Sequence, residues 1–213
     1  PATRIAMRRP LPPGPFHGSD GRMKTFEQMI QCYGRFREGD WHKQHDRWEQ
    51  LREGQSPQVM VIACSDSRVD PAQIFDVDPG EIFVVRNVAA LVPPFETTPG
   101  RHGVSAALEF AVQFLKVREV VVMGHGMCGG CKAALTQDLH GNALGEGGFV
   151  AHWIDMLDAV REPIAAEKGT SGRVAERAMR TTHSCPAAGI YRMRFFLLQK
   201  EPPAPFYVVF KTT

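Results

Sequence analysis

Two short segments of the chain carry residue types that bind soft metal ions. The first contains Cys64, and the second, about sixty residues later, contains His125 and Cys128. Two thiolates and one imidazole suit zinc, and three protein ligands leave its fourth position open for water. A structural zinc site is normally closed by a fourth Cys or His. The sequence therefore predicts a catalytic Zn²⁺ ion held by Cys64, His125 and Cys128.

The chemistry of such a site is the activation of water. Zinc lowers the pKa of a bound water molecule from about 15.7 toward about 7, which provides a hydroxide nucleophile. Two thiolates donate more charge to the metal than three imidazoles would. We therefore expect the bound water to be less acidic than at an all-histidine site, and activity to rise toward alkaline pH.

Asp66 and Arg68 follow the first cysteine and lie two residues apart. In an extended turn they would face the same side, where Asp66 would either accept a hydrogen bond from hydroxide or ligate the metal. A bidentate guanidinium pair would hold the carboxylate away from the metal. An Asp that caps the next turn and an Arg on the surface fit the spacing equally well.

Three short apolar runs, at residues 58–63, 82–85 and 120–123, are typical of strands in a buried parallel sheet. Both metal-binding segments directly follow such a run. Because sites in open parallel sheets form beyond the carboxyl ends of the strands, we expect the two segments to meet there.

Apolar residues recur at helical spacing across residues 103–116, between the second and third runs. A strand, a helix and a strand in this order make a right-handed βαβ unit. Further helices are predicted at 25–37, 129–139 and 149–168, with a glycine-rich loop at 141–148. The prediction is one α/β domain with a central, mainly parallel sheet flanked by helices.

The composition is that of an ordinary globular protein. The 213 residues are 43% apolar and 23% charged, with a formal net charge of +2. This charge does not favour nucleic acid as a partner, and no apolar run reaches the roughly 18–20 residues that span a bilayer. Five cysteines without a secretory signal indicate metal or catalytic thiols in a reducing compartment, so a cytoplasmic location is expected.

Cys64-x-Asp66-x-Arg68 together with His125-x-x-Cys128 resembles the signature of β-carbonic anhydrases. The resemblance implies that these are three zinc ligands and a catalytic Asp–Arg pair. It also implies reversible hydration of carbon dioxide to bicarbonate and a proton, by attack of zinc-bound hydroxide. The similarity covers about residues 23–180 and includes the run FVVRNVA at 83–89.

The resemblance also implies a substrate site. Gln55 matches a glutamine that donates to bicarbonate in the plant-like subgroup, and Phe83 and Val88 match an apolar wall that receives carbon dioxide. The N–H group of Gly129 would help to hold an oxyanion. Ala63 is also plant-like, and we expect no regulation by a non-catalytic bicarbonate site, which belongs to the subgroup with glycine there.

Two departures from the family stand out. Phe110 replaces a tyrosine, and residues 181–213 lack the helix and edge strands used for dimer packing in the family. A proline-rich stretch at 201–205 and a lone strand-like run at 206–210 appear instead, which suggests a divergent or frame-shifted end. The predicted organisation is a disordered tail at 1–22, a β-carbonic anhydrase domain at 23–180 and an atypical C-terminal segment at 181–213. A homodimer or higher homo-oligomer is implied.

Other interpretations of these motifs are weaker. Cys128 and Cys131 form a C-x-x-C pair, but no second pair exists to complete a zinc ribbon, and a redox pair is disfavoured because His125 already accounts for Cys128. Gly124-x-Gly126-x-x-Gly129 fits a dinucleotide fingerprint without the acidic residue that should end a second strand. A related zinc hydrolase, such as a carbon disulfide hydrolase, and a non-catalytic zinc-binding homologue remain as alternative functions.

Overall fold

A computed structural model describes residues 24–95, 97–170 and 190–193. The chain divides into two compact units, Pro1–Gly54 and Gln55–Thr213. The predicted tail at 1–22, and residues 181–189 and 194–213 with the strand-like run at 206–210, lie outside the described residues. No helix in the described part of the chain is long and apolar enough to cross a membrane.

The N-terminal unit contains three helices, α1 (Phe26–Glu38), α2 (Asp40–Lys43) and α3 (His45–Glu53). Thr25 starts α1 with a capping box, in which its hydroxyl accepts from the Gln28 N–H and the Gln28 side chain accepts from the Thr25 N–H. The helix predicted at 25–37 is thereby confirmed, whereas α2 and α3 were not predicted. None of these helices contains a buried residue.

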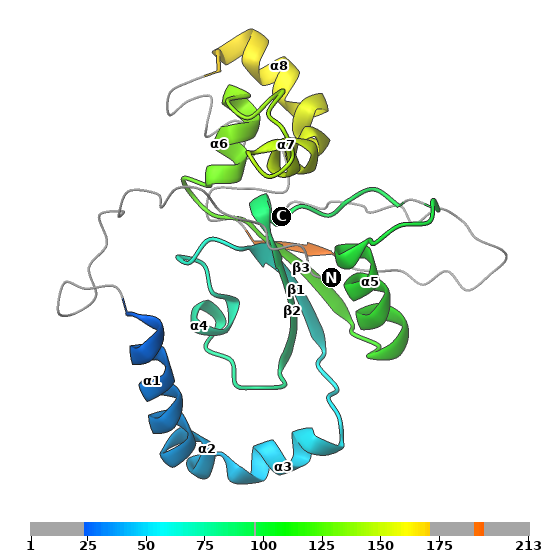
Figure 1. The fold of residues 1–213 in the computed structure, drawn as a ribbon. Coiled ribbons are helices and arrows are strands. Elements are labelled where there is room, and N and C mark those ends of the chain that lie inside the picture. The colour runs from blue at the N-terminus through cyan, green and yellow to red at the C-terminus, as the bar shows by residue number, and fades with distance from the viewer. Residues whose placement is uncertain (1–23, 96, 171–189, 194–213) are drawn as a thin grey trace, which may run out of the picture. The chain divides into compact units, whose positions relative to one another are not determined.

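The second unit is built on a four-stranded sheet in the order β2-β1-β3-β4 (Figure 1). The strands are β1 (Val59–Cys64), β2 (Ile82–Asn87), β3 (Glu119–Met123) and β4 (Ile190–Met193). β1 pairs in parallel with both β2 and β3, and β4 pairs antiparallel with β3. The mainly parallel sheet and its first three strands are therefore confirmed. β4, a short edge strand within the C-terminal segment, was not predicted.

The core of the unit centres on β1. Its residues Met60, Val61, Ile62 and Ala63 are at most 1% exposed. A central strand covered on both faces needs apolar residues at successive positions, so this run does not alternate. On β3, Val120 and Val122 are equally buried.

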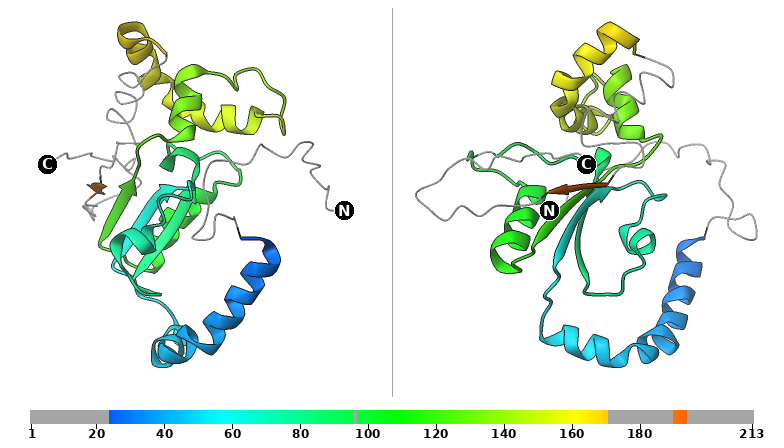
Figure 2. Two further views of the ribbon diagram at one scale, coloured as in Figure 1. Left: turned by 90° about the vertical axis from the view of Figure 1, so that its left-hand side faces the viewer. Right: turned by 180° about the vertical axis from the view of Figure 1, so that it is seen from behind.

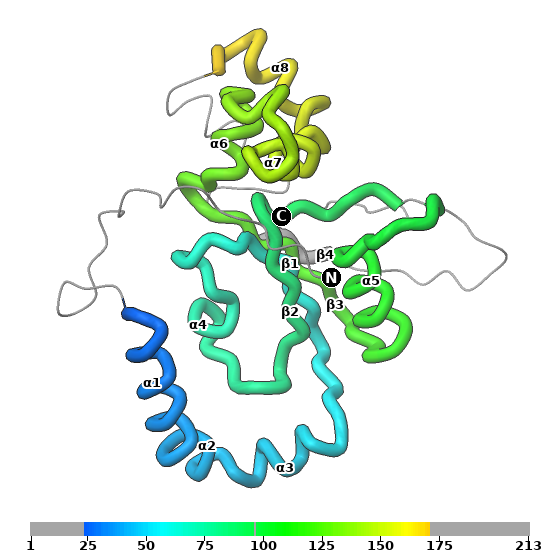
Figure 3. The backbone as a smooth tube through the Cα atoms, in the orientation of Figure 1, coloured from blue at the N-terminus to red at the C-terminus, as the bar shows by residue number. Residues whose placement is uncertain are grey.

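The other helices surround the sheet (Figures 1 and 2). The short helix α4 (Pro71–Phe75) and α5 (Gly103–Glu109) lie on opposite sides of the strands. Beyond the carboxyl ends of β1 and β3, α6 (Gly129–Thr136), α7 (Gly148–Ile154) and α8 (Asp158–Lys168) pack together, as the tube drawing also shows (Figure 3).

Two predicted helices are interrupted. The one at 103–116 continues past α5 as a π-helical turn, η2 (Phe110–Phe114), closed by the Leu115 N–H donating to the Phe110 carbonyl. The one at 149–168 is divided by the 3₁₀ turn η3 (Asp155–Leu157). A further 3₁₀ turn, η1 (Val88–Ala90), directly follows β2.

Candidate metal centre

The three predicted ligands converge at the carboxyl end of the sheet. Cys64 is the last residue of β1, and His125 and Cys128 lie in the turn between β3 and α6. Their potential ligand atoms all lie within 4.8 Å of one another, and the two Sγ atoms are 3.9 Å apart. The convergence follows from topology, because β1 and β3 are parallel neighbours and end at the same edge.

His125 has the tautomer geometry of a metal ligand. Its Nδ1 atom lies 2.9 Å from the Gly126 carbonyl oxygen, so a proton on Nδ1 is donated there and the Nε2 lone pair remains available. His125 is only 5% exposed, and its Nε2 atom has no hydrogen-bond partner. A buried, unpartnered nitrogen beside two thiols matches the donor set that zinc prefers.

Without a cation, the site favours protons on its ligands. The hydrogen bond with Cys128, reinforced by burial, raises the pKa of the Cys64 thiol. Burial would lower the pKa of His125, but the neighbouring thiols and Asp66 outweigh it and raise that pKa. A bound divalent metal would reverse this balance, since coordinating thiols are deprotonated.

Asp66 and Arg68 form the bidentate pair that their spacing allowed. Arg68 donates from Nε to Asp66 Oδ1 at 2.8 Å and from Nη2 to Asp66 Oδ2 at 2.6 Å. The hydrogen bonds from Arg68 hold the pKa of Asp66 well below its usual range, so the carboxylate is ionised at neutral pH. Asp66 Oδ2 lies 3.9 Å from His125 Nε2, at the edge of the ligand cluster.

Val88 and Gly129 lie on elements next to the ligand cluster, whereas Phe83 lies near the start of β2, in register with Met60 and four residues before Asn87, which pairs with Cys64. Phe83 is on β2, with its ring centroid 5.9 Å from that of Phe110. Val88 begins η1, where its carbonyl accepts a hydrogen bond from Trp153 Nε1 on α7. Gly129 is the first residue of α6, whose N-cap makes no side-chain capping bond.

Gln55 is not brought to this cluster within one chain. It is exposed and lies four residues before β1, at the end of the strand opposite to Cys64. With a rise of about 3.3 Å per residue, β1 alone separates the two ends by roughly 16 Å. Gln55 therefore lies far from the ligands of its own chain.

The turn after β2 is a feature that sequence reasoning missed. Ala89 and Ala90 adopt left-handed φ angles of 67° and 55°, although neither is glycine. The Asn87 side chain spans this turn with hydrogen bonds to both the N–H and the carbonyl of Leu91. The signal was present as the run at 83–89, but its geometry is visible only in three dimensions.

Gly130 permits α6 to approach this turn. A Cβ atom on Gly130 would lie 2.8 Å from Val88 Cγ1 and 2.9 Å from Ala89 Cβ. Such contacts are closer than real Cβ atoms tolerate, so a glycine is required here. Val88 and the start of α6 are thereby packed together.

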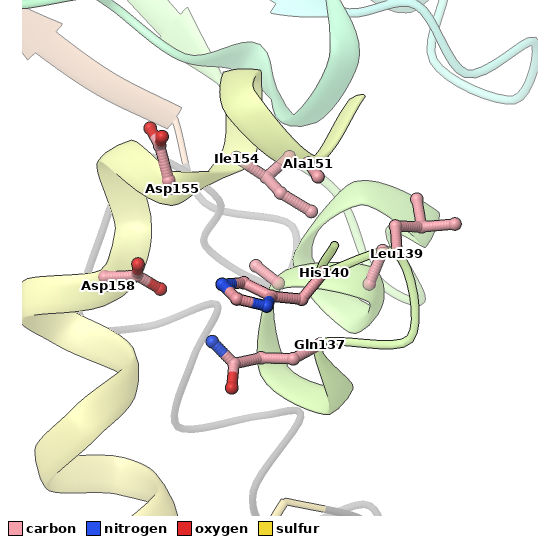
Figure 4. A pocket seen from close by; sticks show the side chains of 9 residues that line it. Gln137, Leu139, His140, Ala151, Ile154, Asp155 and Asp158 are labelled. Carbon is pink, nitrogen blue, oxygen red and sulfur yellow. The ribbon is translucent and has the colours of Figure 1, made fainter. Parts of the chain in front are cut away.

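A shallow hollow elsewhere in this unit contains none of the predicted site residues. It lies among α6, α7 and α8 and is lined by apolar residues such as Leu139 and Ile154 together with the polar residues Gln137, His140, Asp155 and Asp158 (Figure 4). The three predicted ligands and the Asp66–Arg68 pair lie instead at the carboxyl ends of β1 and β3.

The sequence profile of the family described as carbonic anhydrase matches residues 59–186. The chain belongs to the β-carbonic anhydrase family. The matched range contains every predicted site residue except Gln55. β-Carbonic anhydrase 5, chloroplastic, from Arabidopsis thaliana is 36% identical over 142 residues, which are 67% of this chain and 46% of that protein. The chain spans about half the length of the curated relatives it matches.

Solved β-carbonic anhydrases share the fold. The enzyme CcaA is 31% identical with a TM-score of 0.63, over 73% of this chain and 70% of that chain. A structure reported for two tetrameric β-carbonic anhydrases of Sordaria macrospora is 28% identical with a TM-score of 0.60, over 73% of this chain and 75% of that chain. This similarity agrees with the α/β architecture expected of a β-carbonic anhydrase.

Proposed function

We propose that this protein binds one Zn²⁺ ion through Cys64, His125 and Cys128 and catalyses the reversible hydration of carbon dioxide to bicarbonate and a proton. The observation that carries the proposal is the buried cluster of two thiols and an unpartnered imidazole nitrogen within 4.8 Å. The Asp66–Arg68 pair directly beside it supports a catalytic rather than a structural metal.

Zinc bound here would acidify a water molecule and so supply the nucleophile. Asp66 Oδ2, an ionised acceptor, takes the hydrogen bond that orients the attacking oxygen. Arg68 keeps Asp66 charged and pointing in one direction, because its two parallel hydrogen bonds restrict rotation of the carboxylate.

Carbon dioxide is small and uncharged, so an apolar wall suits it better than a polar one. Phe83 and Val88 provide this wall in the proposal. The N–H group of Gly129, at the start of α6, stabilises the negative charge that develops on the product oxygens.

The deciding experiment is stopped-flow carbon dioxide hydration at alkaline pH, with the zinc content determined on the same sample. We expect about one zinc per chain and hydration activity that is lost in Cys64→Ala. Zinc without hydration activity would favour a related hydrolase or a non-catalytic homologue, and a carbon disulfide assay would separate the two. A protein that takes up no zinc would refute the site.

We propose further that the active form is a homodimer or higher homo-oligomer in which Gln55 serves the site of a second copy. Gln55 lies at the wrong end of β1 for its own site. The relatives from Sordaria macrospora are described as tetrameric.

The helix α1 carries an apolar stripe that could join two copies. It consists of Phe26, Met29, Ile30 and Tyr33, each of which is 54–71% exposed.

Mixing two inactive variants tests the role of Gln55. In a mixed oligomer of Gln55→Ala and Cys64→Ala, the first chain keeps its metal ligands and receives Gln55 from the second. Activity that reappears on mixing supports the proposal, and no recovery contradicts it.

The apolar stripe is tested separately. Ile30→Glu should reduce the mass measured by light scattering, whereas Gln31→Glu, on the opposite face of α1, should not. An unchanged mass for Ile30→Glu would show that the stripe does not join copies.

A cytoplasmic location is also a proposal. It is supported by the odd number of cysteines in the chain, five, which does not suit a framework of disulfides. The relative from Arabidopsis thaliana is named chloroplastic. Fluorescence of the tagged full-length protein in its own cells would show which compartment applies.

A further inference from the structure

Arg86 lies on β2 beside the first ligand segment, with its Cα atom in register with Ala63. Its Nε atom donates to the Cys64 carbonyl at 2.9 Å, and its Nη2 atom donates to the Asp66 carbonyl at 2.7 Å. One guanidinium thus fixes the backbone at both the first metal ligand and the acid of the catalytic pair.

The guanidinium is anchored by Asp70. Arg86 Nη1 donates to Asp70 Oδ2 at 3.0 Å, and the other carboxylate oxygen of Asp70 accepts from the N–H groups of Ala72 and Gln73. Asp70 therefore joins Arg86 to the N-terminus of α4. All three guanidinium nitrogens are occupied, and the Arg86 side chain is 26% exposed.

Arg68 and Arg86 bind different groups of Asp66, its carboxylate and its carbonyl. Arg68 binds its carboxylate and also donates to the Met127 carbonyl in the second ligand segment. Arg86 binds only the backbone of the first segment. Lysine could not replace either arginine in these hydrogen bonds, because a single ammonium group cannot span several acceptors in a fixed fork.

We propose that Arg86 is a positioning residue that sets the direction of Cys64 toward the metal and of Asp66 toward the reacting oxygen. The inference rests on the proposed function, because it assigns Arg86 a part in the zinc site. Groups that orient metal ligands from outside typically change metal affinity or activity about 10- to 100-fold when they are lost.

The test compares Arg86→Lys with the wild-type protein. Zinc affinity is measured by competition with a chelator, and the Co²⁺-substituted protein is compared by its visible absorption spectrum. We expect zinc affinity to fall about 10- to 100-fold, the cobalt bands to shift, and kcat to fall more than KM rises. Arg161→Lys is the matched control, because Arg161 makes a similar ion pair with Asp158 and is also largely buried.

Chemical rescue adds a readout that a merely structural role would not give. Added guanidinium ion should restore activity to Arg86→Ala in a saturable way and leave the wild-type rate unchanged. If Arg86→Ala does not fold, Asp70→Asn replaces it, since asparagine still caps α4 while weakening the ion pair with Arg86.

Wild-type zinc affinity, cobalt spectrum and kcat in both Arg86→Lys and Asp70→Asn would overturn the inference. The inference would also be overturned if Arg86→Lys only lowered the melting temperature, by as much as Arg161→Lys does, and left zinc affinity, cobalt spectrum and kcat unchanged. A wild-type protein that binds zinc but does not hydrate carbon dioxide would refute the proposed function, yet the metal affinity of Arg86→Lys would still decide the role of Arg86.

Discussion

At the scale of single residues, Arg68 contacts both segments that carry the proposed metal ligands. It pairs with the Asp66 carboxylate and donates to the Met127 carbonyl, which lies between His125 and Cys128. Met127 holds a left-handed φ of 56°, so the second segment is bent where Arg68 secures it. Loss of this side chain should therefore disturb the carboxylate and the turn together.

Arg68→Gln should lower kcat on the order of 100-fold, because Asp66 loses the two parallel hydrogen bonds that orient its carboxylate.

Arg68→Gln should also change the dependence of stability on pH. The pKa of Asp66 is depressed in the folded protein, so its pairing with Arg68 stabilises the fold above the unfolded pKa of about 3.9. That stabilisation is lost as the pH falls through the folded pKa.

Thermal unfolding of the wild-type protein and Arg68→Gln across pH checks this direction. The wild-type protein should melt at the higher temperature at pH 7, and the difference should shrink below about pH 4. A difference that stays constant down to pH 3 would contradict the proposed ion pair.

At the scale of elements, the turn η1 is held between β2 and the helices beyond the sheet. Asn87 closes it from one side, Trp153 binds the Val88 carbonyl, and Gly130 lets α6 pack against it. Two left-handed alanines within η1 store strain that these contacts must offset. The position of Val88, proposed above as part of the wall for carbon dioxide, therefore depends on packing between α6 and η1.

Gly130→Ala should destabilise the protein by about 1–3 kcal/mol, because the added methyl overlaps Val88 and Ala89. Gly103→Ala is the control, since a Cβ atom there meets nothing within 4 Å. Urea unfolding of both variants provides the comparison. Equal stability of the two would argue against the close approach of α6 to η1.

At the scale of the whole molecule, zinc would join β1 to the turn between β3 and α6. A metal that binds only the folded chain stabilises it, by about 2.7 kcal/mol when free zinc is 100 times its dissociation constant. The fold and the metal centre should therefore be coupled.

Removal of zinc with a chelator should lower the melting temperature of the wild-type protein, and added zinc should restore it. Cys64→Ala should show no such response. A melting temperature that does not depend on zinc would indicate that the cluster does not hold the ion in the folded protein.

Much of this protein could be predicted from local patterns. The buried strands could be recognised in the sequence because a central parallel strand must be apolar on both faces. The motifs that contain Cys64 and His125 lie at the carboxyl ends of two of these strands. The pairing of Asp66 with Arg68 was compatible with the spacing, but only the folded turn showed that the two side chains are hydrogen-bonded.

The tertiary structure decided what depends on contacts between distant segments. No periodic signature in the sequence marks the hydrogen bonds of Arg86 to carbonyls 22 and 20 residues away, the left-handed turn at Ala89 or the edge strand β4. Nor could the sequence show that Gln55 lies at the far end of β1. Residue types and spacing indicated which chemistry to expect of this chain. Strand direction and packing decided which groups meet, because these two features depend on neighbours that are remote along the chain.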